Sequence, residues 1–265
     1  MIDIDRLKKG KELFREYYLK YHNEYDSLIE SCKSKVKTKV ISKVDSYPIN
    51  FDLCDVLAHK KTKAFSKLSR KPVSGNYTEH CYDENDKLIL SMAFENSCPS
   101  HIEVLIYDDD RIAVLSFDNG HFLYKVQITA YSSNALTAYI CCNYRKFSGF
   151  MMDYSSYTFD KNRQLQLIET SYNRLLMAET DEELLSYDTY VEKCLSDESL
   201  LSMSWSVFNL ECKYSDSGLL SEIRTFEQHF SPDFISCENI AKINEKTALA
   251  FRGKITEMLD LFPAC

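Results

Sequence analysis

The sequence predicts an α+β fold: an antiparallel β-meander sheet with N-terminal helices, a helical insert and a C-terminal helix. The main observation is that, between about residues 76 and 170, short runs of alternating apolar and polar residues follow one another with only a few turn residues between them. Connections this short join antiparallel neighbours, because a parallel crossover needs a dozen residues or more. On both sides of this region, apolar residues recur at steps of three and four, which is typical of helices.

The chain is expected to form a single domain, residues 1–265, because a hydrophobic share of 45% is enough to bury a core. The charge is divided unevenly along it. Residues 1–75 carry 17 Lys and Arg against 10 Asp and Glu, whereas residues 76–265 carry 15 against 30. We therefore expect a helical, basic head at 1–75 and an acidic β-meander body at 76–265.

The head begins with an apolar and aromatic helical face that extends from Ile4 to Cys32. In residues 33–43 lysines alternate with Val and Thr, which fits either a short strand or the frayed basic end of a helix. After Pro48, Asn50 is expected to cap a second helix that ends before Pro72.

The body is expected to contain strands, then a helical insert, then a strand pair and a closing helical region. The insert, near 180–200, starts with a capping box in which Thr180 is the N-cap and Glu183 the third helical residue. Ser231 and Pro232 are expected to open the closing helical region. The alternating runs are residues 101–107, 112–117, 122–131, 135–142, 151–159, 165–170, 205–214 and 220–226.

One hairpin pattern recurs: an aromatic residue, then Asp or Ser, a polar turn and an apolar return strand. It appears at residues 82–89, 107–112, 117–122, 159–165 and, more loosely, 214–220. The Asp side chain can cap the turn, and residues that tolerate a left-handed backbone can close it. The pattern resembles the tyrosine–aspartate hairpins of RHS-type repeat proteins over about a fifth of the chain, without a fixed repeat period.

The N-terminus is charged from its third residue, and no apolar run approaches 18 residues. We therefore expect no export signal, no membrane-spanning helix and a cytoplasmic location. The ten cysteines are irregularly spaced in a long chain, so buried, reduced thiols are expected rather than a disulfide framework.

The sequence contains no nucleophile elbow, no metal-ligand spacing and no phosphate-binding loop, so no enzymatic activity, cofactor or metal is expected. The best nucleophilic candidate is the pair His80 and Cys81. Neighbours on a strand face opposite ways, so a core Cys and an exposed His are expected instead. An enzyme with an unrecognised site stays open as an alternative, with His80, Cys81, His101 and His121 as the residues to test.

The acidic body, the helices beside a meander and the content of Cys, Tyr and acidic residues are similar to the immunity proteins of bacterial polymorphic-toxin systems. The resemblance implies a non-enzymatic, cytoplasmic protein that binds and neutralises a cognate, basic protein toxin. Carboxylates on hairpin turns and on the insert would steer such a partner. The expected partner-binding residues are Asp83, Glu84, Asp86, Asp108, Asp109, Asp110, Glu179, Asp181, Glu182, Glu183, Asp188 and Glu192.

Two further interpretations concern other partners. The lysine-rich residues 33–43 and 60–71 could contact nucleic acid, but the acidic body would repel phosphates, so these residues are expected to pair with the body instead. The alternative to toxin binding is a structural or scaffold β-meander module that uses its sheet for protein assembly.

Overall fold

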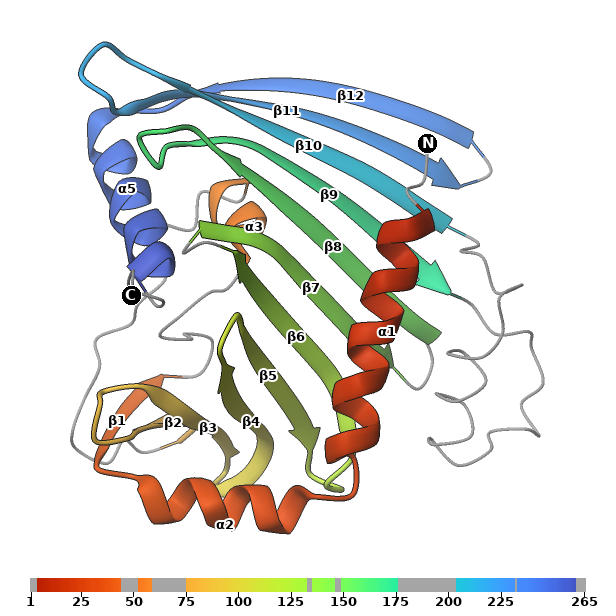
Figure 1. Cartoon of the computed structure of the whole chain (residues 1–265), viewed down its shortest axis with the longest axis vertical. Helices are drawn as coiled ribbons and strands as arrows, with labels where there is room; N and C mark the ends of the chain where they lie inside the picture. Colours follow the sequence, from red (N-terminus) through yellow and green to blue (C-terminus); the bar gives the residue numbers. More distant parts are fainter. Residues whose placement is uncertain are drawn as a thin grey trace.

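The computed structural model describes residues 4–43, 52–58, 75–132, 135–145, 149–175, 204–231 and 233–260. They form one open sheet of twelve antiparallel strands, in which every strand pairs with its neighbours in the sequence (Figure 1). The predicted antiparallel meander is therefore confirmed. The two edges are β1 (Thr38–Lys43) and β12 (Asp233–Lys242). Between them lie β2 (Tyr77–Tyr82), β3 (Leu88–Glu95), β4 (Cys98–Asp108), β5 (Arg111–Asp118), β6 (Leu123–Ser132), β7 (Ala135–Arg145), β8 (Gly149–Phe159), β9 (Leu165–Leu175), β10 (Ser204–Tyr214) and β11 (Leu220–Ser231).

Helices pack on both faces of this sheet. On one face, α1 (Ile4–Tyr21) and α2 (Tyr25–Lys35) pack against a row of strand residues that includes Val104, Leu115 and Val126. On the other face, α3 (Leu53–Ala58) and α5 (Glu245–Asp260) pack against a row that includes Leu105 and Val114. The two rows alternate along each strand, as the pleat requires.

The inner strand β5 shows why both faces of the sheet are covered by helices. All six residues from 112 to 117 are buried, so this strand is apolar on both sides rather than on one. An antiparallel sheet with one solvated face would expose every second residue. Covering both faces turns the meander into a layer between helices.

The N-terminal region differs from its expected form in two ways. Its helical face is divided at residues 22–24 into α1 and α2, and the basic stretch contains both the end of a helix at Lys35 and a strand from Thr38. β1 pairs with β2 from Thr38 opposite Tyr82 to Lys43 opposite Tyr77. The segment 1–75 is therefore not purely helical, because its last described strand is the edge of the body's sheet. This pairing joins residues about 40 positions apart, which no local pattern reports.

The C-terminal region also differs. The expected closing helical region from Ser231 begins instead with strand β12, which pairs with β11 from Asp233 to Lys242, and the helix α5 starts only at Glu245. Asn244 caps α5, since its Oδ1 accepts a hydrogen bond from the Thr247 amide at 2.9 Å. The pairing with β11 supplies backbone partners along residues 233–242 and thereby decides the strand. The predicted insert near 180–200 lies outside the described residues.

Four hairpins share one turn, which explains the recurring sequence pattern. In each, the first turn residue exchanges backbone hydrogen bonds with residues three and four positions later, and the fourth turn residue has a left-handed backbone. The left-handed residues are Asp86 (φ 58°), His121 (φ 67°), Arg163 (φ 59°) and Gly218 (φ 73°). A bulge in the strand pairing accompanies each turn. This is the geometry of a type I turn followed by a left-handed residue. The copy at residues 107–112 differs, because Asp108 pairs directly with Arg111 across a two-residue turn.

In three of these turns an aspartate makes the same two hydrogen bonds. Asp83 Oδ1, for example, accepts from the amides of Asn85 and Lys87, both at 2.9 Å. Asp118 and Asp160 do the same in their own turns. Because these three turns share the same two hydrogen bonds, the first aspartate of each is a structural residue.

Replacing Asp83 with alanine is therefore expected to lower the free energy of unfolding by about 1 kcal/mol, because two turn amides lose their intramolecular acceptor. Glu84 occupies the same turn and carries the same charge without a hydrogen bond to it, so Glu84→Ala is the matched control and should change stability by less than about 0.5 kcal/mol. Urea denaturation of both variants measures the difference. Equal effects of the two substitutions would show that the turn does not depend on the Asp83 cap.

The eight described cysteines are all free, and five of them are buried. They are Cys32, Cys54, Cys81, Cys98, Cys141, Cys142, Cys212 and Cys237.

Candidate functional site at the hairpin-turn end of the sheet

Alternate hairpin turns of a meander lie at the same end of the sheet. The β2–β3, β4–β5, β8–β9 and β10–β11 turns therefore share one end, which we call the hairpin-turn end. The first two of these turns contain the six described partner-binding candidates. The other two meet the helix α5, as Figure 1 shows.

Three of the six candidate carboxylates are already engaged within the protein. Asp83 caps its own turn, as described above. Asp108 Oδ2 accepts a hydrogen bond from the Tyr17 hydroxyl of α1 at 2.5 Å. Burial and this hydrogen bond to Asp108 raise the pKa of Tyr17. Asp110 forms an ion pair with Arg111 at 2.8 Å, and this contact lowers the pKa of the Asp110 carboxyl group.

The other three, Glu84, Asp86 and Asp109, are exposed, and none of their side chains makes a hydrogen bond or ion pair with the described residues. We call these three residues the acidic turn patch. The structure thus divides the predicted set into residues that build the turns and residues that face solvent.

The two turns that form the acidic turn patch are held to one another. Tyr107, at the end of β4, donates a hydrogen bond from its hydroxyl to the Leu88 carbonyl of β3 at 2.9 Å. The Lys87 ammonium lies over the Tyr107 ring, 5.0 Å from its centre. Burial, and then the charge of Asp83, raise the pKa of Tyr107, so the hydroxyl stays a donor over the whole neutral range.

A further carboxylate near the acidic turn patch comes from the basic head. Glu16 of α1 lies 3.8 Å from the Arg111 guanidinium and is 63% exposed. No sequence pattern singled it out, because it is one carboxylate within the long helical segment of the basic head. It reaches the turn only because α1 packs across the sheet. The candidates Glu179, Asp181, Glu182, Glu183, Asp188 and Glu192 lie outside the described residues.

The pair His80 and Cys81 is not a nucleophile with its base. The two residues face opposite sides of β2, as predicted: Cys81 packs in the cluster with α1 and α2, whereas His80 bonds to serines on the neighbouring strands. The expectation of an exposed histidine is wrong, because His80 is fully buried between Ser42 Oγ at 2.8 Å and Ser91 Oγ at 3.0 Å. Burial raises the pKa of the Cys81 thiol to about 12, which leaves almost no thiolate at neutral pH.

A buried ionic network lies next to His80 on the same face, and sequence reasoning missed it. Glu103 Oε1 lies 3.1 Å from His101 Nε2, 3.3 Å from Ser116 Oγ and 3.4 Å from Lys125 Nζ. The Tyr124 hydroxyl contacts the other ring nitrogen of His101 at 2.9 Å. Burial alone would raise the pKa of Glu103, but His101 and Lys125 outweigh it and lower the pKa to about 2. Glu103 is therefore a permanent anion at neutral pH, held by its own neighbours.

A second polar cluster lies on the same face, beside α3. Asp153 of β8 is directly opposite Cys141 on one side and Tyr172 on the other. Burial, and then the charge of Asp52, raise the pKa of Asp153 to about 7. Asp52 is itself the N-terminal cap of α3, because its Oδ1 accepts a hydrogen bond from the Cys54 amide at 2.9 Å. The charge that helps to raise the pKa of Asp153 is therefore that of the residue capping α3.

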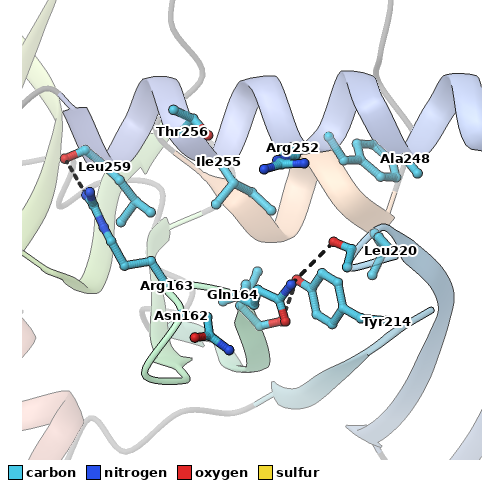
Figure 2. Close-up of a pocket in the computed structure, with 13 residues that line it drawn as sticks. Asn162, Arg163, Gln164, Tyr214, Leu220, Ala248, Arg252, Ile255, Thr256 and Leu259 are labelled. Atoms are coloured by element: carbon cyan, nitrogen blue, oxygen red, sulfur yellow. Dashed lines mark hydrogen bonds between the residues drawn. The ribbon is translucent and has the colours of Figure 1, made fainter. Parts of the chain in front are cut away.

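A pocket of about 190 Å³ lies at the hairpin-turn end between the β8–β9 turn, the β10–β11 turn and α5 (Figure 2). Its polar wall includes Asn162, Arg163, Gln164 and Arg252, and its apolar wall includes Phe251 and Leu220. Sequence reasoning missed this pocket, since its three walls come from segments that are far apart in the chain.

Neither a metal centre nor a spanning helix is present in the part of the chain that the structure describes. No group of three or more His, Cys, Asp or Glu side chains there could hold a metal ion. Within the same residues, no helix has both the length and the apolar character needed to cross a membrane.

Comparison with known proteins identifies no family for this chain. No family model matches the chain, and no curated protein matches it. Among solved structures, a porin-like protein from Bacteroides uniformis is similar at 7% sequence identity and a TM-score of 0.22, over 63% of this chain and 90% of that protein. A similarity at this level carries no argument about fold or function.

Proposed function

We propose that this chain is a non-enzymatic binding protein that docks a basic protein partner at the hairpin-turn end of its sheet and neutralises it, the partner being a bacterial toxin. One observation carries the proposal: the side chains of Glu84, Asp86 and Asp109 are exposed and unengaged by the described residues, on two adjoining turns held together by Tyr107.

The charge at these turns favours a basic partner. Residues 83–87 contain three carboxylates and one lysine, and residues 108–111 contain three carboxylates and one arginine, which gives the two turns a net charge of −4. Carboxylates fixed on a rigid surface accelerate the association of a positively charged partner and reject acidic ones. Toxins that act on nucleic acids need a basic surface for the phosphates, and an acidic inhibitor can occupy that surface.

The rigidity of the turns also matters for affinity. The turn that carries Glu84 and Asp86 is closed by the Asp83 cap, and the turn that carries Asp109 is fixed on one side by Tyr17 and on the other by Arg111. Ordered side chains and loops lose less entropy when a partner binds. The carboxylates that bond within the protein thus hold the turns in place, and the exposed carboxylates of the acidic turn patch are left to contact the partner.

The test removes the charge of the acidic turn patch without removing its turns. The triple variant Glu84→Gln, Asp86→Asn, Asp109→Asn is expected to bind the partner at least tenfold more weakly at physiological salt, mainly through slower association. The partner is obtained by affinity capture from the cells in which the protein is made, and its association and dissociation rates are then measured with purified components.

The matched control removes three exposed carboxylates elsewhere: Glu30→Gln on α2, Glu95→Gln on β3 and Glu211→Gln on β10. It changes the net charge by the same amount and should change the association rate less than threefold. If both triple variants lose binding equally, only the net charge matters and the hairpin-turn end is not the interface. Turnover of a substrate by the purified protein alone would contradict the non-enzymatic proposal.

A second candidate function, a scaffold module, is favoured by the edge strand β12. Its residues 236–240 are all exposed, including Ile240 at 49%, and none of the described strands pairs with its outer edge. An exposed edge offers unpaired backbone groups to a strand from another chain. Light scattering across a range of concentrations distinguishes the two functions, because a scaffold that works through β12 should self-associate and lose this property in Ile240→Lys.

A further inference from the structure

The pocket between α5 and the last two hairpin turns is a site of a different kind from the acidic turn patch. Its floor is apolar: Leu165 of β9, Leu220 of β11 and Phe251 of α5 are all buried and face into it. Its lining also includes polar residues, among them Asn162 and Gln164 from the β8–β9 turn and Thr256 from α5 (Figure 2). A concave apolar floor with a few polar groups above it is the usual form of a small-molecule site.

The charge of this pocket is opposite to that of the body around it. Arg163, from the β8–β9 turn, and Arg252, from α5, line it, and no carboxylate is among the lining residues. The body as a whole has 30 Asp and Glu against 15 Lys and Arg, so a lining with two arginines and no acid stands apart from its surroundings. Arginine offers planar, paired donors that match a carboxylate.

Hydrogen bonds fix the walls of the pocket. Arg163 donates from Nη2 to the Leu259 carbonyl of α5 at 3.4 Å, which ties the turn to the helix. Gln164 donates from Nε2 to the Gly218 carbonyl at 3.3 Å, which ties the two turns to one another. The Tyr214 hydroxyl donates to the Leu165 carbonyl at 2.9 Å beneath them. Figure 2 shows these three bonds as dashed lines.

The backbone of both turns is adapted to this arrangement. Arg163 has a left-handed backbone (φ 59°), which an arginine adopts only at some cost in free energy. In the neighbouring turn the equivalent position is Gly218, where an added Cβ would lie 3.3 Å from Gln164 Nε2. A side chain at this position would therefore require the Gln164 amide group to shift by a few tenths of an ångström.

We propose that this pocket binds a small organic anion: a monocarboxylate whose apolar or aromatic part fills the floor while its carboxylate meets Arg252 and Arg163. The volume sets the size class, because an engineered apolar cavity of about 150 Å³ holds one benzene molecule. A pocket of about 190 Å³ thus admits a benzene ring with a short acidic substituent. The site is separate from the acidic turn patch and does not depend on the proposed partner.

The probes are benzoate and 3-phenylpropanoate, tested on the full chain by isothermal titration calorimetry and by ligand-observed NMR. Saturable binding with a dissociation constant below about 1 mM is expected for at least one of them, and it should weaken as ionic strength rises. The uncharged analogues benzamide and 3-phenylpropanamide should bind at least tenfold more weakly, because they cannot pair with the arginines.

Arg252→Gln tests the site directly, since Arg252 is exposed and its replacement should leave the fold intact. It should weaken binding of the carboxylate at least tenfold and leave the amide unchanged. The matched control is Lys246→Gln, which removes one exposed positive charge from the same helix outside the pocket and should change the affinity less than twofold. Thermal unfolding of both variants verifies that they are folded.

Two results would overturn the proposal. One is the absence of saturable binding of either carboxylate up to about 10 mM, a level at which even weak fragment binding is measurable. The other is equal binding of the carboxylate and its amide, or equal loss in Arg252→Gln and Lys246→Gln. Either equality would show that the arginine pocket does not recognise the anion.

Discussion

Replacing Glu103 with glutamine is expected to lower the free energy of unfolding by about 3 kcal/mol at pH 7, because removing one partner of a buried ion pair leaves the other uncompensated. Glu103 is 6% exposed, and a single carboxylate oxygen contacts His101, Ser116 and Lys125. Glutamine has the same shape but no charge. Lys125 is 22% exposed and can turn partly toward water, which keeps the loss at the lower end of the range for such pairs.

The effect of Glu103 should depend on pH in a defined direction. Its pKa is about 2 in the folded protein and about 4.3 in an unfolded chain. The stabilising contribution of the ionised group is therefore fully present above about pH 5 and is lost as the pH falls toward 2. The difference between wild type and Glu103→Gln should shrink over this interval. Urea denaturation at pH 7, 5 and 3 follows it.

The control for this variant is Glu79→Gln, which breaks the 2.8 Å ion pair between Glu79 and Lys39 at the edge of the sheet. Lys39 is 55% exposed, and ion pairs with an exposed partner contribute less than about 1 kcal/mol. If Glu79→Gln cost as much as Glu103→Gln, burial of the network around Glu103 would not be the cause.

Replacing Asp153 with asparagine is expected to have the opposite sign: it should stabilise the protein above pH 7, by about 2 kcal/mol. The pKa of Asp153 is about 7 in the folded protein, against about 3.9 in an unfolded chain. Between these values the folded state holds a proton that the unfolded state has released, so the contribution of Asp153 to wild-type stability falls as the pH rises from 4 to 7 and stays level above. A full shift of this size would correspond to about 4 kcal/mol, and partial solvent contact of the side chain reduces it.

Asparagine carries no charge at any pH, so the two proteins should be equally stable near pH 4 and diverge up to pH 7. The matched control is Asp216→Asn, an exposed aspartate in the β10–β11 turn, which should give no such divergence. Hydrogen exchange of the amides of α3 provides a second readout. Ionisation of Asp153 repels Asp52, the cap of α3, and should raise exchange of residues 53–58 in wild type but not in Asp153→Asn. A constant difference between the two proteins across this pH range would contradict the proposed burial of Asp153.

Much of the sheet was predictable because its information is local. Alternating apolar residues set the strands, and turns of only a few residues can only return the chain to its neighbour. The repeated pattern of an aromatic residue followed by Asp or Ser even indicated the turn geometry, as Asp83, Asp118 and Asp160 confirm. The aspartate in each turn is needed within the turn itself, so the signal lies within a few residues.

The edge strands were not predictable in the same way. β1 lies in a stretch of alternating lysines that fits a strand or a helix end, and its pairing with β2 decides between them. β12 was expected to be helical and is a strand because β11 offers it a full row of hydrogen bonds. For such segments, intrinsic preference is weak and the neighbour in space determines the structure.

The candidate sites, too, were predictable only where the signal lies in neighbouring residues. The acidic residues of the hairpin turns were identified from the sequence, but the sequence could not distinguish Asp83, which closes a turn, from Glu84, which faces solvent. The network around Glu103 gave only a weak signal, a glutamate at an inward position of an alternating strand. The arginine pocket gave none, because Arg163 and Arg252 are almost ninety residues apart.

The sequence by itself determined that this protein is an antiparallel meander with repeated aspartate-capped turns and an acidic body, because period, turn chemistry and charge are properties of neighbouring residues. Only the tertiary structure decided which carboxylates are engaged, which polar groups are buried together and where a pocket opens. These properties depend on which distant segments the sheet and its helices bring into contact, and burial then changes the charge and pKa of each group according to those contacts.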